Sequence, residues 1–237
     1  MALSDETRRK LLGVTTATLT TCLLKRNLRN QWLQNVHPLS PTQPRMVGEA
    51  YTLRTIPARE DIDVLEAYAN PDHPQRKAVE TVPAGQVLVI DSRKDARAAS
   101  AGDLLIARMM MRGVAGVVTD GGFRDSPTIA KLGIPCYHQR PSAPTGPIHH
   151  HAVDVQVPIA CGDVAVYPGD VMVGDGEGVV VLPAHLAAEL ADEAAEMTVY
   201  EDFVEAKVRE GRRLPGIYPA TPESRAEFAE WRKVQGR

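Results

Sequence analysis

The spacing of apolar side chains divides the chain into a helical opening, a mixed middle and a long closing helix. In residues 4–34, apolar side chains return at near-helical spacing behind Ser4, which is a suitable N-cap. Three prolines within residues 37–44 predict a loop. After Pro183 an apolar stripe predicts a long helix, and Gly211 is a natural residue to end it.

The middle of the chain alternates between strand and helix patterns. Residues 60–69 and 101–112 have helical spacing, whereas the other apolar runs are short, β-branched and bounded by glycine, proline or aspartate. The predicted strands are residues 47–56, 87–90, 114–118, 133–138, 152–159, 163–166, 171–174 and 178–182. Strands mixed with helices, followed by several strands in succession, indicate an α/β fold around a mixed sheet.

Composition narrows the class of protein. The chain has 237 residues, of which 43% are apolar and 24% charged, which fits one domain with a large core. We expect no membrane segment and no secretion, because no apolar run reaches the roughly 18–20 residues of a bilayer span and no signal-peptide pattern is present. Three widely spaced cysteines predict a reducing cytoplasm. A net charge of −3 argues against nucleic-acid binding.

The most informative stretch is the predicted helix 101–112 and the strand 114–118 that follows it. A turn at Gly113 makes helix and strand antiparallel, so the start of the helix and the end of the strand lie at the same edge. Both legs are roughly 15–20 Å long at the usual rise per residue. We therefore expect Asp103 to lie close to the pair Arg124-Asp125, which follows the strand.

These residues have complementary chemistry for an anionic ligand. The free N–H groups at the helix start, around Leu104 and Leu105, suit a carboxylate, and Arg124 can grip the same carboxylate with its planar guanidinium. Asp125, ionised beside that cation, is a possible ligand for Mg²⁺, and Asp103 could hold or deprotonate a metal-bound water. An α-keto acid bound there would have its enolate stabilised. On geometry alone, a simple helix cap and a loop ion pair are an equally good explanation.

A resemblance to a known family favours the functional interpretation. Asp103, twenty intervening residues and Arg124-Asp125 match the D-x20-R-D signature of the class II 4-hydroxy-4-methyl-2-oxoglutarate aldolases and the regulators of ribonuclease E activity A. Similar stretches are residues 15–18, 48–52, 83–89, 116–121, 168–170 and 178–183. The resemblance covers roughly residues 12–212. It implies an αββα sandwich with a mixed central sheet, the RraA-like or swivelling-domain-like fold. We accordingly expect one catalytic domain over residues 1–212, followed by an extension, 213–237.

The same resemblance implies an activity, a cofactor and an assembly. Such enzymes split aldols to release pyruvate and often decarboxylate oxaloacetate. They use a divalent metal, Mg²⁺ or Mn²⁺, at a site between the subunits of a homotrimer or homohexamer. The expected protein is thus a cytoplasmic metal-dependent lyase whose partners are a small α-keto acid and further copies of itself, without nucleic acid or membrane.

Individual roles follow by matching positions. The resemblance makes Asp125 the metal ligand, Arg124 the contact for the substrate carboxylate and enolate, and Asp103 the group that positions a metal-bound water. Glu201, on the apolar stripe of the long helix, corresponds to a catalytic glutamate contributed by the adjacent subunit. The backbone expected to receive the substrate carboxylate is that of Gly102, Leu104 and Leu105.

Other features leave alternatives open. The segment 57–80 and the tail 213–237 look longer than in compact family members, and this segment, with His149-His150-His151, could shape a pocket for dehydrating a 2-keto-3-deoxy sugar acid. A non-catalytic regulator that binds a ribonuclease E-type partner is a third hypothesis. The histidine triplet is predicted foremost as a solvated linker, and Cys136 as a buried thiol rather than a nucleophile. The tail, with a short helix starting near Thr221, is expected to pack on the core or a neighbouring subunit.

Overall fold

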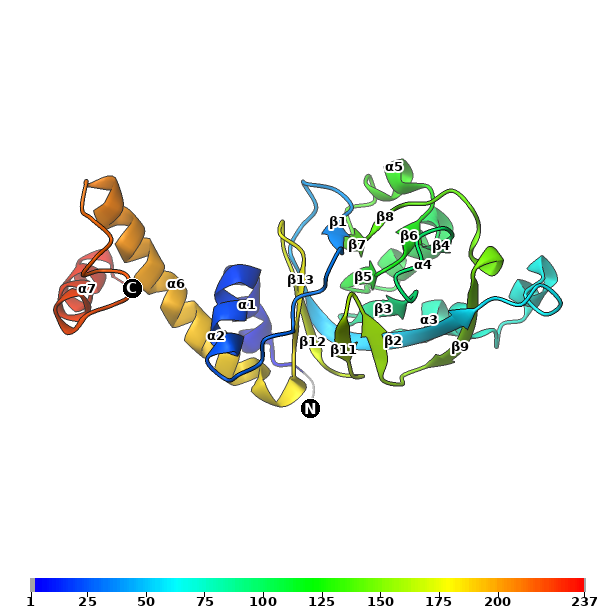
Figure 1. Cartoon of the computed structure of the whole chain (residues 1–237), viewed down its shortest axis with the longest axis horizontal. Coiled ribbons are helices and arrows are strands. Elements are labelled where there is room, and N and C mark those ends of the chain that lie inside the picture. Colours follow the sequence, from blue (N-terminus) through cyan, green and yellow to red (C-terminus); the bar gives the residue numbers. More distant parts are fainter. Residues whose placement is uncertain (1–2, 237) are drawn as a thin grey trace.

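The centre of the molecule is a mixed eight-stranded sheet in the order β1-β7-β5-β3-β2-β12-β13, with β9 paired to β2 (Figure 1). The computed structural model describes residues 3–236. Strands β2, β3, β5 and β7 run parallel, whereas β1, β9, β12 and β13 pair antiparallel to their neighbours. These strands are β1 (His37–Pro38), β2 (Met46–Pro57), β3 (Val87–Asp91), β5 (Gly116–Thr119), β7 (Cys136–His138), β9 (His150–Val155), β12 (Val171–Gly174) and β13 (Val179–Leu182). The α/β class expected from the sequence is confirmed.

Two small sheets and several helices surround this sheet. The small sheets are the pair β10 (Ile159–Cys161) and β11 (Val164–Val166), and the triple β4 (Ala99–Ala101), β6 (Gly122–Phe123) and β8 (Arg140–Pro141). The helices are α1 (Asp5–Gly13), α2 (Thr16–Leu24), α3 (Pro74–Thr81), α4 (Asp103–Met111), α5 (Ser126–Ile129), α6 (Ala187–Arg209) and α7 (Pro222–Gln235), with 3-10 turns at η1 (Leu65–Ala69), η2 (Gly146–Ile148) and η3 (Ala184–Leu186). No helix within residues 3–236 is long and apolar enough to cross a membrane.

The hydrophobic core has three main parts. One lies between the parallel strands and the helices α3 and α4, and includes Val79, Ile106 and Phe123. A second lies on the opposite face beneath β10 and β11, so β3 is buried along its whole length, as is typical of a parallel strand covered on both faces. The third joins α1, α2 and the start of α6 to β12 and β13. This packing fixes the edge at which α4 begins.

The local structure corrects three sequence-based expectations. The opening segment forms two helices, because the Thr15 side chain accepts the N–H of Thr18 and starts α2 anew. Within 60–69 only the 3-10 turn η1 forms. The helix α3 was not predicted, although its start carries a recognisable signal: Pro74 occupies the first turn, and the His73 side chain caps it. The predicted strand 152–159 is divided between β9 and β10.

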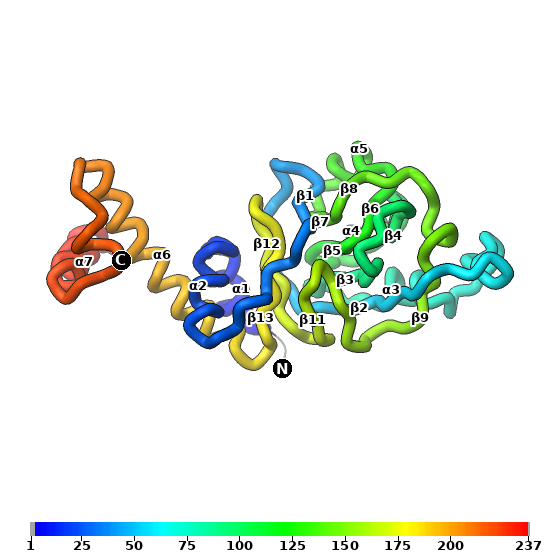
Figure 2. Tube along the Cα trace, in the orientation of Figure 1, coloured from blue at the N-terminus to red at the C-terminus, as the bar shows by residue number. Residues whose placement is uncertain are grey.

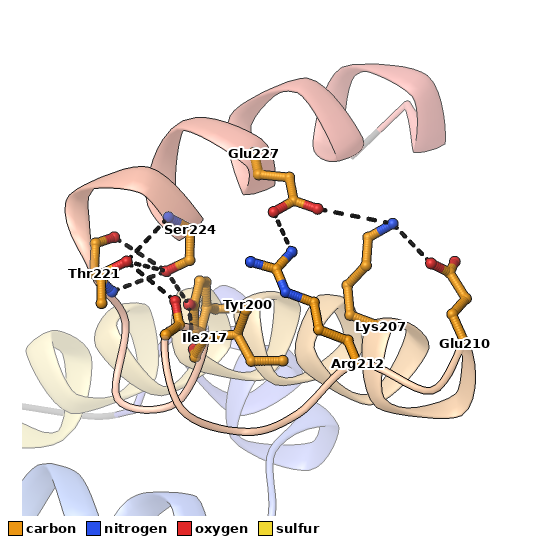
Figure 3. A network of polar contacts seen from close by, with 9 residues as sticks. Tyr200, Lys207, Glu210, Arg212, Ile217, Thr221, Ser224 and Glu227 are labelled. Carbon is orange, nitrogen blue, oxygen red and sulfur yellow. Dashed lines mark hydrogen bonds and ion pairs between the residues drawn. The ribbon is translucent and has the colours of Figure 1, made fainter.

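The chain end forms an arm that extends from the body along α6 (Figure 1). Helix α7 folds back on the second half of α6, and Phe203 and Ile217 are buried between them. The close-up in Figure 3 shows the polar contacts that join the two helices and the segment between them. The Tyr200 hydroxyl of α6 lies 2.9 Å from that of Ser224 in α7 and donates to the Ile217 carbonyl of the connecting segment at 2.6 Å, and Arg212 of that segment pairs with Glu227 in α7. The tail therefore packs on α6 of its own chain. The predicted boundary at residue 212 falls in the turn between the helices, and Met1, Ala2 and Arg237 lie outside the described residues.

Candidate active site

The start of α4 and the segment after β5 meet at one edge of the sheet, as the helix–turn–strand geometry predicts. Strand β4 leads into α4 and pairs in parallel with β6, which leads into Arg124 and Asp125. The Arg124 N–H donates to the Ala101 carbonyl at 3.1 Å, so the two segments are joined directly before both leave the small sheet. Asp103 and Arg124, which have 20 residues between them in the sequence, thus lie at one place.

Gly102 is the point of closest approach between the two segments. A Cβ atom on Gly102 would lie 2.9 Å from Cγ of Arg124 and 3.1 Å from Oδ2 of Asp125. The Arg124 Nε lies 3.4 Å from the same Oδ2, and both side chains are about half exposed. Asp125 has a φ of 57°, in the left-handed region that few non-glycine residues adopt. Conformations of this kind concentrate at functional sites.

The Asp103 side chain also contacts the backbone of its own helix. Asp103 is the first residue of α4, and its Oδ1 accepts the N–H of Leu104 at 2.8 Å. The N-cap is Gly102, and no side chain caps this helix, so Asp103 is a first-turn residue and not the cap that the simpler interpretation expects. In this structure the Leu104 amide is nevertheless bonded to the Asp103 side chain. The N–H of Leu105 lies in the first turn, where no intrahelical partner is available. Of the two amides expected to receive a carboxylate, that of Leu104 is thus already bonded to Asp103.

All of these residues line one pocket with a volume of about 380 Å³. That volume is in the range of small-molecule sites, roughly 300–1,000 Å³. The sequence-predicted residues that line it are Gly102, Asp103, Leu104, Leu105, Arg124 and Asp125. Sequence reasoning missed three further lining residues, which are Tyr68, Gln75 and Arg76. The signal was present in the unusual length of the segment 57–80, although not in any single residue.

The donor atoms at the pocket fit a hard divalent cation. Asp103 and Asp125 both line it and offer carboxylate oxygens. Mg²⁺ is commonly held by one or two carboxylates, with water and substrate oxygens completing its shell. Among residues 3–236 there is no cluster of three or more His, Cys, Asp or Glu side chains that could enclose a metal by itself.

Glu201 lies elsewhere in the chain. It is on α6, where its Oε2 accepts the hydroxyl of Thr18 at 3.2 Å, and it faces a separate groove together with Met197 and Tyr200. The sequence analysis assigned Glu201 to the site of an adjacent subunit. Its placement within one chain does not test that role, which stays a prediction.

The histidine triplet is not a solvated linker. His150 is buried on β9 and its Nε2 lies 3.1 Å from the Ala98 carbonyl oxygen, while Nδ1 of His151 lies 2.7 Å from Oδ1 of Asp63. These contacts attach the strand to neighbouring segments, which explains why a polar run enters the sheet. Cys136 is buried, as expected, and burial raises the pKa of its thiol to about 12. It is therefore a core residue and not a nucleophile.

Comparison with known proteins adds independent information. The family described as "RraA-like: Aldolase/RraA" matches residues 4–181. A protein of Halalkalibacterium halodurans named "Putative 4-hydroxy-4-methyl-2-oxoglutarate aldolase" is 37% identical over 111 residues, which are 45% of this chain and 50% of that protein. A similarly named protein of Ectopseudomonas mendocina is 32% identical over 105 residues, 44% of this chain and 63% of that protein. The chain thus spans about half the length of the curated relatives it matches.

Solved structures show the same fold over longer spans. Streptomyces coelicolor RraAS2, described as an unusual member of the RNase ES inhibitor RraA protein family, superimposes with a TM-score of 0.75 and 30% identity, covering 86% of this chain and 98% of that one. An uncharacterised protein from Pseudomonas syringae has a TM-score of 0.79 and 23% identity, with 92% and 99% covered. The latter identity supports the fold alone.

Proposed function

The chain belongs to the RraA-like family, and on this premise we propose that it is a divalent-metal-dependent carbon–carbon lyase acting on α-keto acids. The observation that carries the proposal is the meeting of Asp103, Arg124 and Asp125 in one pocket beside the start of α4. The names of the aldolase relatives support a lyase of this type. The reaction would be cleavage of a 4-hydroxy-2-oxo acid to release pyruvate, the decarboxylation of oxaloacetate, or both.

Each residue has a distinct task in this reaction. Arg124 binds the 2-oxo carboxylate with its planar N–H pairs and stabilises the negative charge that develops on the C2 oxygen. Asp103 positions the water that takes up the proton of the C4 hydroxyl, and its Oδ2 is the oxygen available for this because Oδ1 accepts the Leu104 N–H. The C3–C4 bond then breaks and its electron pair forms the pyruvate enolate, and the proton taken from the C4 hydroxyl is returned to C3 of this enolate. Oxaloacetate needs no base, since loss of CO₂ leaves the same enolate.

The metal contributes polarisation of the 2-oxo group when it is bound. Asp125 is the carboxylate proposed to hold Mg²⁺ or Mn²⁺, and its ion pair with Arg124 fixes the direction of both side chains. Because the two groups lie 3.4 Å apart, a ligand carboxylate that replaces Asp125 as the partner of Arg124 leaves the aspartate available to a cation. Binding of substrate and cation would thus support each other at this pair.

The test measures pyruvate release by the purified protein from 4-hydroxy-2-oxo acids and from oxaloacetate, before and after chelation and with Mg²⁺ or Mn²⁺ added back. We expect activity only with metal, and a loss of about 100- to 1,000-fold in Arg124→Ala and in Asp125→Asn. Arg97→Ala is the matched control, since Arg97 pairs with Asp95 outside the pocket. Wild-type activity in Arg124→Ala, or pyruvate release that is unchanged after chelation of the metal, would contradict the proposal.

The same purified protein can be used to test two other functions, sugar-acid dehydration and regulation of a ribonuclease. Dehydration of a sugar acid loses water and keeps every carbon, so the product mass distinguishes it from cleavage. A regulatory role has support from the similarity to RraAS2, whose family is described as inhibiting an RNase. Stoichiometric capture of a ribonuclease by the protein, together with no lyase turnover, would favour that role. Assembly as a trimer or hexamer, with the site at a subunit interface, remains part of the lyase proposal.

A further inference from the structure

The pocket that Arg124 lines is also lined by a second arginine, Arg76. We propose that Arg76, held by Tyr68, binds a second anionic group at the end of the substrate distant from the 2-oxo carboxylate. This inference rests on the proposed function, which places the carboxylate of a keto acid at Arg124. It makes Arg76 a specificity-determining residue and predicts that the preferred substrates are dianions.

The start of α3 is fixed to the site by its neighbour in the sequence. Gln75 lines the same pocket, and its Nε2 donates to the Ser100 carbonyl at 2.8 Å. Ser100 belongs to β4, the strand that leads to Gly102 and α4. This hydrogen bond therefore connects the start of α3, which carries Arg76, to the strand that leads to Asp103.

Arg76 is oriented without being neutralised. Its Nε donates to the Tyr68 carbonyl at 3.2 Å, and its guanidinium carbon lies 5.4 Å from the centre of the Tyr68 ring. This geometry is a cation–π contact, which holds the side chain while its charge remains available. Within the described residues 3–236 no carboxylate forms an ion pair with Arg76. An unpaired cation on a pocket wall is suited to an anionic ligand.

Tyr68, which orients Arg76, is itself packed against a neighbouring ring. Its ring lies 4.2 Å from that of His73, the cap of α3, and burial raises the pKa of its hydroxyl to about 12. The phenol therefore stays neutral and adds no negative charge beside Arg76. A preoriented cation loses little conformational freedom when a ligand binds, and this lowers the cost of binding.

The charges of the pocket match a dianion. Arg76 and Arg124 supply two positive charges, and the proposed cation offsets the carboxylates of Asp103 and Asp125. A volume of about 380 Å³ leaves room beyond a pyruvate unit. The second anionic group can be a carboxylate or a phosphate, because a guanidinium pairs with either in the same bidentate manner. A neutral tail would leave Arg76 without a partner.

The experiment compares ligands that the protein cannot cleave because they lack a 4-hydroxyl group. Binding of 2-oxoglutarate, its phosphonate analogue 2-oxo-4-phosphonobutyrate and the matched monoanion 2-oxovalerate is measured by calorimetry with Mg²⁺ present. The variants are Arg76→Gln and Arg76→Lys. The control is Lys77→Gln, which removes an exposed charge from the next position of α3 and does not line the pocket.

Wild type is expected to bind at least one dianion about 10- to 100-fold more tightly than 2-oxovalerate, as one charge-assisted contact provides. Arg76→Gln should remove this preference without weakening 2-oxovalerate, Arg76→Lys should keep part of it, and Lys77→Gln should keep it all. The dianion that loses more affinity identifies the second group as carboxylate or phosphate. Equal weakening of all three ligands, or no preference in wild type, would overturn the assignment.

The result is separable from that of the lyase test. An Arg76-dependent preference without any pyruvate release would disprove the lyase proposal and leave the anion site standing. Metal-dependent pyruvate release without such a preference would support the lyase proposal and disprove the anion site at Arg76.

Discussion

Gly102 lies so close to Arg124 that a methyl group on its Cα would come within 2.9 Å of the arginine Cγ. The same methyl would lie 3.1 Å from Oδ2 of Asp125. Gly102 has a φ of −120°, which every residue can adopt, so the glycine is required by space and not by backbone conformation. The absence of a side chain here is what lets the start of α4 approach the Arg124–Asp125 pair.

This contact predicts the effect of Gly102→Ala. The added methyl must displace Arg124 and Asp125 by several tenths of an ångström, and misplacement of catalytic groups by about 1 Å can cost on the order of 100-fold. We expect kcat/KM for pyruvate release to fall about 10- to 100-fold, while circular dichroism and thermal unfolding stay close to wild type. Gly176→Ala is the control, because a Cβ there meets no atom within 4 Å. Full activity in Gly102→Ala would show that the pair tolerates displacement.

The part of the site that sequence analysis predicted is the part built locally. The convergence of Asp103 with Arg124 depends only on one helix, one turn at Gly113 and one strand, whose lengths are readable from the apolar pattern. The structure adds a detail that the pattern could not give, since Asp103 accepts the Leu104 N–H from within the first turn while Gly102 occupies the N-cap. Whether such a carboxylate bonds to its own helix or to a ligand depends on side-chain geometry, which the apolar pattern does not give.

The contribution of Tyr68 and Arg76 to the pocket could not be predicted, because it depends on distant contacts. Tyr68 and Arg76 reach the pocket only after α3 packs on the sheet and β9 pairs with β2 along the segment that precedes them. Those contacts join positions separated by about one hundred residues, such as Arg54 and Asp154. Apolar spacing indicates which side chains are buried, but it does not say which distant segments pair. The length of the segment 57–80 suggests that it shapes a pocket, but it does not indicate that Tyr68 and Arg76 are the residues that line it.

The contact between His151 and Asp63 leads to a second prediction. The two side chains lie 2.7 Å apart, and the Asp63 side chain is only 3% exposed, so the contact anchors the projecting segment before α3 (Figure 2). His151→Ala leaves a buried carboxylate without this partner, at a cost of about 1–3 kcal/mol. We expect faster amide hydrogen exchange across residues 58–70 and weaker binding of the dianions that depend on Arg76.

The control for this variant is His185→Ala, which removes an exposed histidine at η3. Its exchange pattern across residues 58–70 should match that of wild type. Unchanged exchange there in His151→Ala would mean that the Arg59 N–H, which donates to Asp63 at 2.7 Å, is sufficient to hold the segment.

A third prediction concerns acid stability and His138. This residue is 6% exposed and stacks on Phe123, the residue before Arg124. Burial, with a smaller contribution from His37, lowers the pKa of His138 to about 4. The unfolded chain takes up this proton near pH 6.5, whereas the native state resists it until about pH 4. The unfolded state therefore binds more protons between these values, and stability falls as the pH falls through them.

The size of this effect is about 3 kcal/mol, at about 1.4 kcal/mol per unit of pKa difference. His138→Phe keeps a ring on Phe123 and removes the titrating group. Urea unfolding at several pH values from 4 to 7 should show the variant gaining stability relative to wild type as the pH decreases. Any change in packing adds a constant offset at every pH and leaves this slope intact. A difference between the two proteins that does not vary with pH would contradict the prediction.

The last prediction tests whether Glu201 completes the site of a neighbouring subunit. Arg124 and Glu201 lie in separate places of one chain, so Arg124→Ala and Glu201→Ala damage different contributions to a shared site. We expect each variant alone to be inactive in pyruvate release. In mixed oligomers, a site that pairs an intact Arg124 with a neighbour's intact Glu201 forms in about one quarter of cases by chance. Activity should thus recover to about 25% of wild type on co-refolding. The matched control is a mixture of Arg124→Ala with Asp125→Asn. Both residues belong to the pocket of the same subunit, so every pocket in this mixture carries one of the two substitutions. Recovery only in the first mixture would establish a shared site, whereas no recovery in either would place Glu201 outside the catalytic machinery of the neighbour.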